Sequence, residues 1–297
     1  LEVHGNDILF NDLIIDSRKV KKDDLFVAIP GQNYDGHDYI QESILKGASA
    51  IICNKAYDTK DITVPYIVCE DTISSLGVIA QKYKISHGSP YTIGITGTNG
   101  KTTVTKLTAQ ILKQSYSTST TIGNFNNDIG LPLSIISSIN NEIDKCVYEL
   151  GASKRGDISR LVKICEPDMT TLLNVSEAHM ESFGSMKNLI ATKEEIFSHL
   201  KTNQVILNID DINFQNWKKI NDNKRVITIS LNNNADYFIK SSDRSNYSFS
   251  TVKGDFSIRR DYVSDILPIN LLFSISLSME AGASIEDVKN GLKSFES

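Results

Sequence analysis

Residues 91–103 constrain the fold of this chain more than any other stretch. Residues 91–96 form a β-branched run, Tyr-Thr-Ile-Gly-Ile-Thr, and residues 97–103 read Gly-Thr-Asn-Gly-Lys-Thr-Thr. From Val104 to Leu112, apolar residues recur at helical spacing. The pattern predicts a strand that ends in a tight glycine loop, followed by a helix that begins at Lys101. A strand followed at once by a helix is the repeating unit of α/β folds.

The loop between this strand and helix has the composition of a phosphate site. Glycines let backbone N–H groups approach a phosphate, and Lys101, the Thr102 hydroxyl and the helix N-terminus supply charge and a Mg²⁺ ligand. The strict phosphate-loop pattern has a glycine six residues before the lysine, whereas this chain has Ile95, so the loop is a shortened variant. The alternative is a plain Gly-Asn turn, for which a Lys-Thr pair has little purpose. We therefore expect nucleotide contacts from Gly97, Thr98, Asn99, Gly100, Lys101, Thr102 and Thr103.

Length and composition set the class of protein. A chain of 297 residues is long enough for two domains. With 31 basic and 36 acidic residues the net charge is −5, which argues against a general nucleic-acid binder. The four cysteines lack metal-site spacing and lie in apolar runs, as is typical of a cytoplasmic protein. No run approaches the ~20 apolar residues of a membrane span. Leu1 is not an initiator residue, which suggests a trimmed chain.

Residues 1–88 read as a small α/β unit, closed by a linker at 86–90 (Ser-His-Gly-Ser-Pro). Two polar clusters, Asp16-Ser17-Arg18 and residues 31–37, fall on loops beside expected strands. Turn formation alone would explain most of their residues. The expected elements are strands at 25–29, 50–53 and 66–68, and helices at 39–47 and 73–83.

Strands and helices alternate again in residues 89–297, which predicts a second domain with a mostly parallel, P-loop-type central sheet flanked by helices. Ligands of such sheets bind at the carboxyl ends of the strands. Short alternating strands are expected at 235–260, before two closing helices at 268–281 and 284–294. The other expected elements are strands at 145–150, 169–173, 205–209 and 226–229, and helices at 157–165, 187–200 and 211–219.

Three further residues lie where a phosphate-handling site would need them. Glu149 ends an expected strand, and its carboxylate offers the hard oxygen ligands that Mg²⁺ prefers. His179 follows the strand at 169–173, and Lys193 lies on the next expected helix. Each has an ordinary alternative, as a solvated strand-end acid, a surface histidine or a solvated helix lysine.

Several motifs, in order along the chain, closely resemble the Mur ligase family. They are Gly97-Thr-Asn-Gly-Lys-Thr-Thr, Glu149-Leu-Gly-Ala, Ala178-His-Met-Glu-Ser-Phe-Gly-Ser and Lys193. His179 and Lys193 are 14 residues apart, which fits the family's spacing between a Mg²⁺-binding histidine and a carbamylated lysine. Residues 123–130, followed by Pro132-Leu, look like the branch that adds D-alanyl-D-alanine. The first domain, with Asp16-Ser-Arg and Asp35-Gly-His-Asp, is similar to the family's uridine-nucleotide-binding domain.

The resemblance implies an ATP-dependent amide ligase that joins D-alanyl-D-alanine to UDP-N-acetylmuramoyl-tripeptide through an acyl phosphate. In such an enzyme Lys101 and the loop would hold the ATP phosphates. Thr102 and Glu149 would position one Mg²⁺, and His179 and a carbamylated Lys193 a second. Catalysis would consist mainly of positioning and charge neutralisation. The resemblance also implies substrate contacts from Ser17, Arg18, Asn126 and Asn127, and a cytoplasmic monomer.

Two departures from the family pattern stand out. Family members carry a third, C-terminal domain, which we expect to be absent from this chain, so that this fragment alone would be inactive. The family's adenine-holding stretch appears here as Ser264-Asp-Ile-Leu-Pro-Ile-Asn270, in which only Asn270 is retained. The usual Asn-His after the Glu149 motif is replaced by Ser153-Lys154.

Two alternative functions stay open at this point. One is a sibling ligase of the same family that adds a single amino acid, which a screen of amine acceptors would separate. The other is a non-catalytic homologue that binds a UDP-linked muropeptide. The altered adenine stretch favours this second alternative, while the set of Lys101, Glu149, His179 and Lys193 argues against it, because a pure binder has no need of these residues.

Overall fold

The computed structural model describes residues 1–31, 33–177 and 183–295. The chain divides into two compact units, Leu1–Ala80 and Gln81–Ser297. The division falls inside helix α2 (Thr72–Ser86), ahead of the linker expected at 86–90. The assignment of residues 1–88 and 89–297 to separate functions stays a prediction. Each unit has its own sheet, as the sequence predicts.

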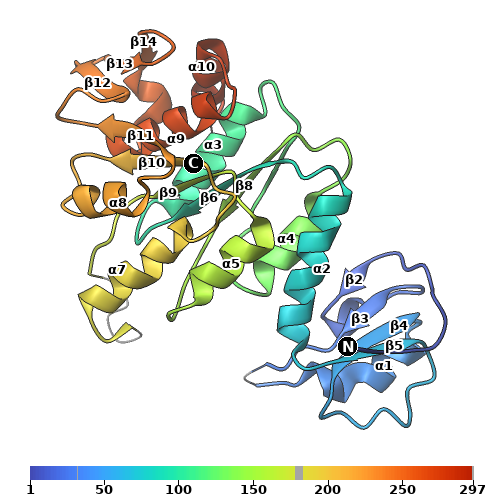
Figure 1. Ribbon diagram of the computed structural model, residues 1–297. Helices are drawn as coiled ribbons and strands as arrows, with labels where there is room; N and C mark the ends of the chain where they lie inside the picture. Colours follow the sequence, from blue (N-terminus) through green and yellow to red (C-terminus); the bar gives the residue numbers. More distant parts are fainter. Residues whose placement is uncertain (32, 178–182, 296–297) are drawn as a thin grey trace. The chain divides into compact units, whose positions relative to one another are not determined.

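The first unit contains a five-stranded sheet with the order β1-β5-β4-β3-β2 (Figure 1). Strands β2 to β5 are parallel, and β1 runs antiparallel to β5 at one edge. Val20, Phe26, Ile40 and Ile51 belong to one buried cluster on this sheet. The elements are β1 (Glu2–His4), β2 (Leu13–Ile14), η1 (Ser17–Lys19), β3 (Leu25–Val27), η2 (Gly36–Tyr39), α1 (Ile40–Leu45), β4 (Ala50–Asn54) and β5 (Tyr66–Cys69).

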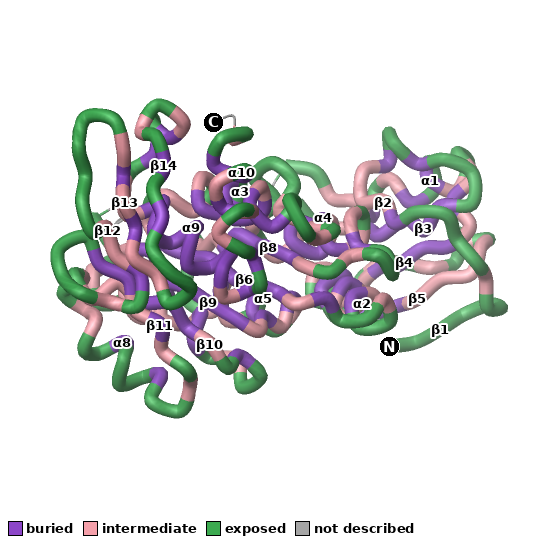
Figure 2. The backbone as a smooth tube through the Cα atoms, turned by 90° about the horizontal axis from the view of Figure 1, so that it is seen from above, coloured by how far each residue is buried: buried purple, intermediate pink, exposed green. Residues whose placement is uncertain are grey.

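The second unit contains a nine-stranded sheet with the order β14-β13-β12-β11-β10-β9-β6-β8-β7. Strands β6 to β12 are parallel, and β13 and β14 continue the sheet in antiparallel fashion. The central strands are buried along their length (Figure 2). The nine strands of the sheet are β6 (Tyr91–Thr96), β7 (Thr118–Thr120), β8 (Lys145–Glu149), β9 (Met169–Leu172), β10 (Gln204–Asn208), β11 (Arg225–Ser230), β12 (Tyr237–Ser242), β13 (Asn246–Thr251) and β14 (Phe256–Arg259).

Helices cover both faces of this sheet. Helices α3, α9 and α10 share one core cluster with β6, β10 and β11, while α5 and α7 contact each other on the opposite face (Figure 1). Among the described residues no helix is long and apolar enough to cross a bilayer. The helices are α3 (Lys101–Leu112), α4 (Gly130–Ser138), α5 (Asp157–Cys165), α7 (Met186–Glu194), η3 (Glu195–Phe197), α8 (Phe214–Ile220), η4 (Arg260–Val263), α9 (Pro268–Glu280) and α10 (Ile285–Lys293).

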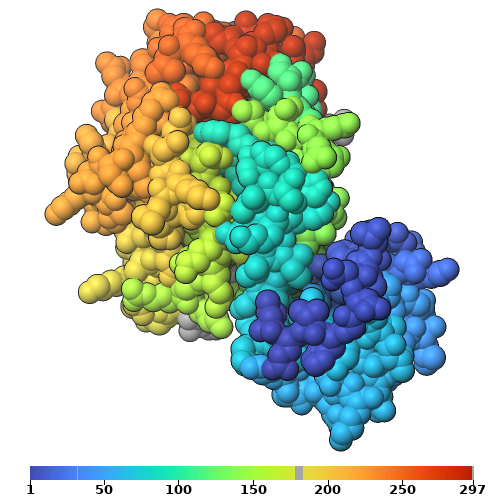
Figure 3. Space-filling model, turned by 45° about the vertical axis from the view of Figure 1, so that its right-hand side comes forward, coloured from blue at the N-terminus to red at the C-terminus, as the bar shows by residue number. Residues whose placement is uncertain are grey.

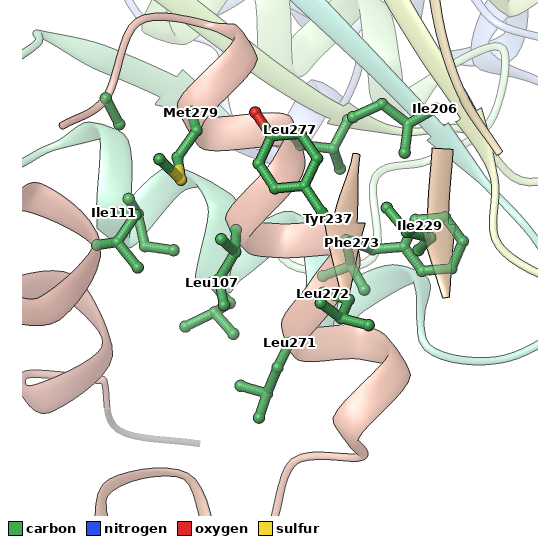
Figure 4. Packing of buried hydrophobic residues seen from close by; sticks show 14 of the residues in the cluster. Leu107, Ile111, Ile206, Ile229, Tyr237, Leu271, Leu272, Phe273, Leu277 and Met279 are labelled. Carbon is green, nitrogen blue, oxygen red and sulfur yellow. The ribbon is translucent and has the colours of Figure 1, made fainter. Parts of the chain in front are cut away.

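The packing of α3 against α9 fixes the helix that follows the glycine loop. Leu107 and Ile111 of α3 belong to the same buried cluster as the α9 side chains Leu272 and Met279 (Figure 4). The chain after about residue 235 gathers at one end of this unit (Figure 3). Because α3 is covered by α9 and α10 as well as by the sheet, its N-terminus is held at a fixed place.

The α/β class and the parallel central sheet are confirmed. The expected helix at 187–200 is too long, since α7 ends at Glu194 and continues as the 3₁₀ turn η3. The sequence analysis missed β1, β2, β7 and α4. The three strands have only two or three residues, too few for a periodic signal, and α4 begins with a glycine and carries a proline in its first turn, where proline is tolerated.

We predict that Gly291→Ala destabilises the second unit. A Cβ at Gly291 on α10 would lie 2.6 Å from the Ile111 Cα of α3. Overpacking of this kind costs about 1 to 3 kcal/mol, more than the helix propensity that alanine adds. Urea denaturation should show the loss, whereas the exposed neighbour Asn290→Ala should change the free energy of unfolding by less than ~0.5 kcal/mol. Equal stability of the two variants would contradict this packing.

Candidate active site

The glycine loop lies at the carboxyl end of β6 and turns directly into α3, as predicted. Gly100 has a left-handed backbone with φ +85°, and a Cβ there would lie 2.8 Å from the Asn270 Oδ1. A Cβ at Gly97 would lie 3.0 Å from the Leu173 Cβ at the end of β9. The two glycines therefore meet two different needs, a left-handed turn at Gly100 and close backbone approach at both positions.

The Lys101 side chain folds back over its own loop. Its Nζ donates hydrogen bonds to the carbonyl oxygens of Gly97 (3.0 Å) and Thr98 (2.9 Å). Burial lowers the pKa of this lysine, and the Glu149 charge partly opposes the shift. The first helical hydrogen bond runs from the Val104 N–H to the Gly100 carbonyl, and no side chain of the described residues caps the helix. The N–H groups of residues 100–103 are thus left at the open end of the helix.

Glu149 ends β8 with its side chain only 4% exposed. Its Oε2 accepts a hydrogen bond from the Thr102 hydroxyl (2.7 Å), and its Oε1 accepts one from the Asn126 Nδ2 (2.7 Å). The Glu149 backbone N–H donates to the Thr121 hydroxyl at 2.8 Å. A carboxylate and a hydroxyl are thus in direct contact at the start of α3, and both are hard oxygen ligands of the kind that Mg²⁺ takes.

This donor set fits a magnesium ion shared with a phosphate. Among the residues that the structure describes, no group of three or more His, Cys, Asp or Glu side chains could hold a metal alone. Mg²⁺ is commonly bound by one or two protein oxygens, with water and substrate phosphate completing its shell. Thr102 and Glu149 match that pattern, and His179 lies outside the described residues.

Lys193 lies near the end of α7 and lines the same cavity as Lys101. Its side chain is buried, and within the described part of the chain no hydrogen-bond or ion-pair partner exists for its Nζ. Burial, reinforced by the Lys101 charge and partly opposed by Glu149, lowers the pKa of Lys193 to about 8. A sizeable neutral fraction is therefore present near physiological pH.

Two consecutive carboxylates fix the backbone after Lys193. Glu194 accepts hydrogen bonds from the Trp217 Nε1 (3.0 Å) and the Asn216 Nδ2 (2.9 Å) on α8. Glu195 turns the other way and accepts from the N–H groups of Gly156 (2.7 Å) and Ser159 (3.1 Å), at the N-terminus of α5. The donors on α8 and the N-terminus of α5 both favour a negatively charged carboxylate. The two glutamates therefore hold the turn after Lys193 between helices α5 and α8.

Lys101, Asn126 and Lys193 line a cavity of about 410 Å³. On one wall, Arg160 is paired with Asp157 (2.6 Å) and Asp128 (3.5 Å), whereas Lys154 makes no ion pair within the described ranges. Excess positive charge in a cavity suits an anionic ligand. The lining residues are Gly97, Thr98, Lys101, Asn126, Asn127, Asp128, Gly151, Ala152, Ser153, Lys154, Asp157, Arg160, Leu161, Phe183, Leu189 and Lys193.

Asn126 and Asn127, which are expected to contact substrate, line the cavity, but their side chains make hydrogen bonds within the protein. Asn126 orients Glu149, and the Asn127 Oδ1 accepts hydrogen bonds from the N–H groups of Ile129 (3.2 Å) and Gly130 (2.7 Å) at the start of α4. Asn270, expected near the nucleotide, is buried on α9 against Gly100. Substrate contacts by these three residues stay predictions.

Ser17 and Arg18 belong to the first unit, where they line a separate cavity of about 420 Å³ together with Asp16, Tyr34 and Tyr39. Arg18 forms two hydrogen bonds of 2.9 Å with Asp16, which lower the pKa of that carboxyl to about 2. The Ser17 residue is buried, and its carbonyl accepts a hydrogen bond from the Lys46 Nζ at 3.0 Å. Both residues thus flank one hollow, and their contact with substrate stays a prediction.

Sequence reasoning missed Asn174 and Ser176, which follow β9 and bond to the glycine loop. Their position immediately after a strand was a usable signal, because side chains at the carboxyl ends of neighbouring parallel strands converge. To use this signal one must know that β9 pairs with β6, and no local sequence pattern predicts that pairing.

Comparison with known proteins agrees with this geometry. The profile of the Mur ligase middle domain matches residues 95–277, and the profile described as the Mur ligase family, catalytic domain, matches residues 10–85. This chain belongs to the Mur ligase family. It is 33% identical over 287 residues to the UDP-N-acetylmuramoyl-tripeptide–D-alanyl-D-alanine ligase of Haemophilus influenzae, covering 94% of this chain and 61% of the relative. The Escherichia coli enzyme of the same name is 31% identical, covering 99% and 66%.

Solved structures of Mur ligases share the fold. MurF from Acinetobacter baumannii matches with a TM-score of 0.87 at 25% identity, covering 96% of this chain and 63% of that one. MurF from Thermotoga maritima, in complex with ADP, matches with a TM-score of 0.83 at 28% identity, covering 99% and 68%. A UDP-N-acetylmuramoyl-L-alanyl-D-glutamate–2,6-diaminopimelate ligase matches at 0.68 with 19% identity, covering 97% and 63%. The chain thus spans slightly under two thirds of the length of the two curated relatives.

We predict that Lys193→Met stabilises the metal-free protein at pH 7. Lys193 has a pKa of about 8 when folded, against an ordinary value of 10.5. The unfolded chain therefore binds the proton more tightly, and the cost of burying the charge is fully present below pH 8 and fades between pH 8 and 10.5. The variant should gain up to about 3 kcal/mol at pH 7 and less at pH 10.

The matched control is Lys187→Met, which removes an exposed lysine from the same helix α7. Urea unfolding with a chelator present at both pH values gives the comparison. A gain for Lys193→Met that is the same at pH 7 and pH 10 would show that its buried charge is not the cause.

Proposed function

We propose that this chain forms the precursor-binding and ATP-binding parts of a MurF-type ligase, which joins D-alanyl-D-alanine to UDP-N-acetylmuramoyl-tripeptide. The observation that carries the proposal is the hydrogen bond between Thr102 and Glu149, at the start of a helix with four free N–H groups. Lys101 and Lys193 line the same cavity. The names of the relatives supply the substrates.

The residues of the second unit would act mainly by positioning. The N–H groups of residues 100–103 would bind the terminal phosphates of ATP, and Lys101 would exchange its two loop carbonyls for phosphate oxygens. Thr102 and Glu149 would hold Mg²⁺, which neutralises phosphate charge when bound. The substrate carboxylate would attack the γ-phosphate and release ADP. The acceptor amine would then displace phosphate from the acyl phosphate, losing a proton.

Lys193 would be carbamylated in the active protein. The neutral amine adds to CO₂, an N–C bond forms, and a proton leaves, which yields an anionic carbamate. The supporting observations are the burial of Lys193, its lowered pKa and its place in the lining of the same cavity as Lys101. A carbamate would turn a poorly placed cation into a metal-binding oxygen ligand, the role that the family resemblance implies for Lys193.

The first unit would bind the UDP end of the precursor at residues 1–88, with Ser17 and Arg18 among the contacts. The supporting observation is the hollow that both residues line. All four cysteines are unpaired and buried, which suits the reducing cytoplasm, where we place the protein as a monomer. The third domain of the family would complete the nucleotide site in the full ligase.

The two alternative functions are disfavoured but stay open. A MurE-like ligase that adds a single amino acid is disfavoured, because the diaminopimelate ligase structure matches this chain less closely than the MurF structure does. A non-catalytic muropeptide binder would have no use for a Thr102–Glu149 hydrogen bond at the start of α3 together with a cavity lined by Lys101 and Lys193. A screen of acceptor amines separates the first alternative, and phosphate release separates the second.

We predict that Mg-ADP binds the 297-residue chain and that Lys101→Ala weakens binding at least ~tenfold, because one charge-assisted contact to phosphate is lost. Calorimetric titration measures both affinities. The control Lys106→Ala removes an exposed lysine from the same helix and should bind like wild type. In the complete gene product, phosphate release should require both the UDP-linked tripeptide and D-alanyl-D-alanine. Equal ADP affinities for wild type and Lys101→Ala would refute the site.

A further inference from the structure

The tip of the glycine loop is fastened to the segment that follows β9. Asn174 is 75 residues from Asn99 in sequence, yet its carboxamide pairs with the Asn99 peptide group. The Asn174 Oδ1 accepts from the Asn99 N–H (3.0 Å), and its Nδ2 donates to the Asn99 carbonyl (3.0 Å). The Asn174 carbonyl also accepts from the Thr98 N–H at 3.0 Å. One residue thus binds three backbone groups of the loop.

Ser176 adds weaker contacts of the same kind. Its N–H donates to the Thr98 hydroxyl (3.1 Å), and its hydroxyl accepts from the Asn99 Nδ2 (3.3 Å). The approach is close because Gly97 lies against Leu173, at the point where β6 and β9 end side by side. The loop and the segment 173–176 therefore form one hydrogen-bonded layer.

This layer decides which backbone groups can reach a phosphate. The N–H groups of Thr98 and Asn99 already donate to Asn174, so the N–H groups of residues 100–103 are the ones left for an anion. The carbonyl oxygens of residues 97–99, which would repel a phosphate, also accept hydrogen bonds from the protein. Lys101 binds those of Gly97 and Thr98, and Asn174 binds that of Asn99.

We propose that Asn174 is a positioning residue of the phosphate loop, which keeps the Asn99 carbonyl away from the nucleotide and holds the free N–H groups of residues 100–103 in register. The proposal rests on the proposed nucleotide site. Its importance rises on binding, because Lys101 would leave the loop carbonyls for the phosphates. Among the described residues, Asn174 would then be the remaining side chain that hydrogen-bonds to the backbone of residues 97–99.

The carboxamide is suited to this task by its chemistry. It carries one acceptor and one donor in a single plane, and so it matches the N–H and C=O of one peptide group. A carboxylate has no donor for the Asn99 carbonyl, and alanine has neither group. Asn174→Ala should therefore release the loop tip without altering any group that touches the nucleotide.

The test compares wild type, Asn174→Ala and Lys101→Ala, each as the 297-residue chain with Mg-ADP. Asn174→Ala should weaken binding about tenfold or more, since two hydrogen bonds that hold the loop are lost. Amide hydrogen exchange at Asn99 should also become about tenfold faster without nucleotide. The control Asn140→Ala removes an exposed side chain that accepts one backbone hydrogen bond, from Glu142 at 2.9 Å, and should change neither quantity.

Amide chemical shifts in the wild-type protein provide a readout that needs no variant. On addition of Mg-ADP, the largest changes should fall on residues 100–103, while Thr98 and Asn99 stay slow to exchange. Fast exchange at Asn99 in the free protein would overturn the proposal even if Asn174→Ala does not fold.

The outcomes distinguish failure of the Asn174 positioning role from failure of the nucleotide site. If wild type binds Mg-ADP, Lys101→Ala does not, and Asn174→Ala binds like wild type, the positioning role is wrong while the nucleotide site stands. If wild type does not bind, or Lys101→Ala binds equally well, the nucleotide site fails and the role of Asn174 fails with it. A lower melting temperature of Asn174→Ala with unchanged affinity shows a structural role only, and also overturns the proposal.

Discussion

The hydrogen bond between the Thr102 hydroxyl and the Glu149 carboxylate is the contact on which the rest of the site depends. It joins the first turn of α3 to the end of β8, two elements that are adjacent because β8 pairs with β6. Packing of α3 under α9 and α10 keeps the helix end from moving. The sheet, the helix layer and the Thr102–Glu149 pair are therefore parts of one arrangement.

Charge distribution explains why this cavity suits phosphates. Lys101 is partly buried and Lys193 is buried; burial is the main cause of the lowered pKa of both lysines, and the Glu149 carboxylate partly opposes the shift. Burying like charges together costs free energy, which a bound polyanion recovers. The carboxylates of Glu194 and Glu195 hold the Lys193 turn from behind without entering the charge balance of the cavity.

Much of this could be predicted from the sequence, because the strongest signals were local. The β-branched run at 91–96, the helix start at Lys101 and the helix at 157–165 were predicted to the residue. The position of Lys193 facing Lys101, and the link from Asn174 to Asn99, depend on which strands become neighbours. That order is set by packing over the whole unit, so no local pattern carried it. Asn126 shows the same limit, since its bond to Glu149 spans 23 residues.

The most direct test of the account is to locate the metal with a paramagnetic substitute. Mn²⁺ added with ADP to the ¹⁵N-labelled chain broadens the amide signals nearest to it. The account predicts the strongest broadening at residues 101–103 and at Leu150 and Gly151, next to Thr102 and Glu149, and the loss of that pattern in Glu149→Gln. Broadening that spares these residues, or that persists unchanged in Glu149→Gln, would contradict it.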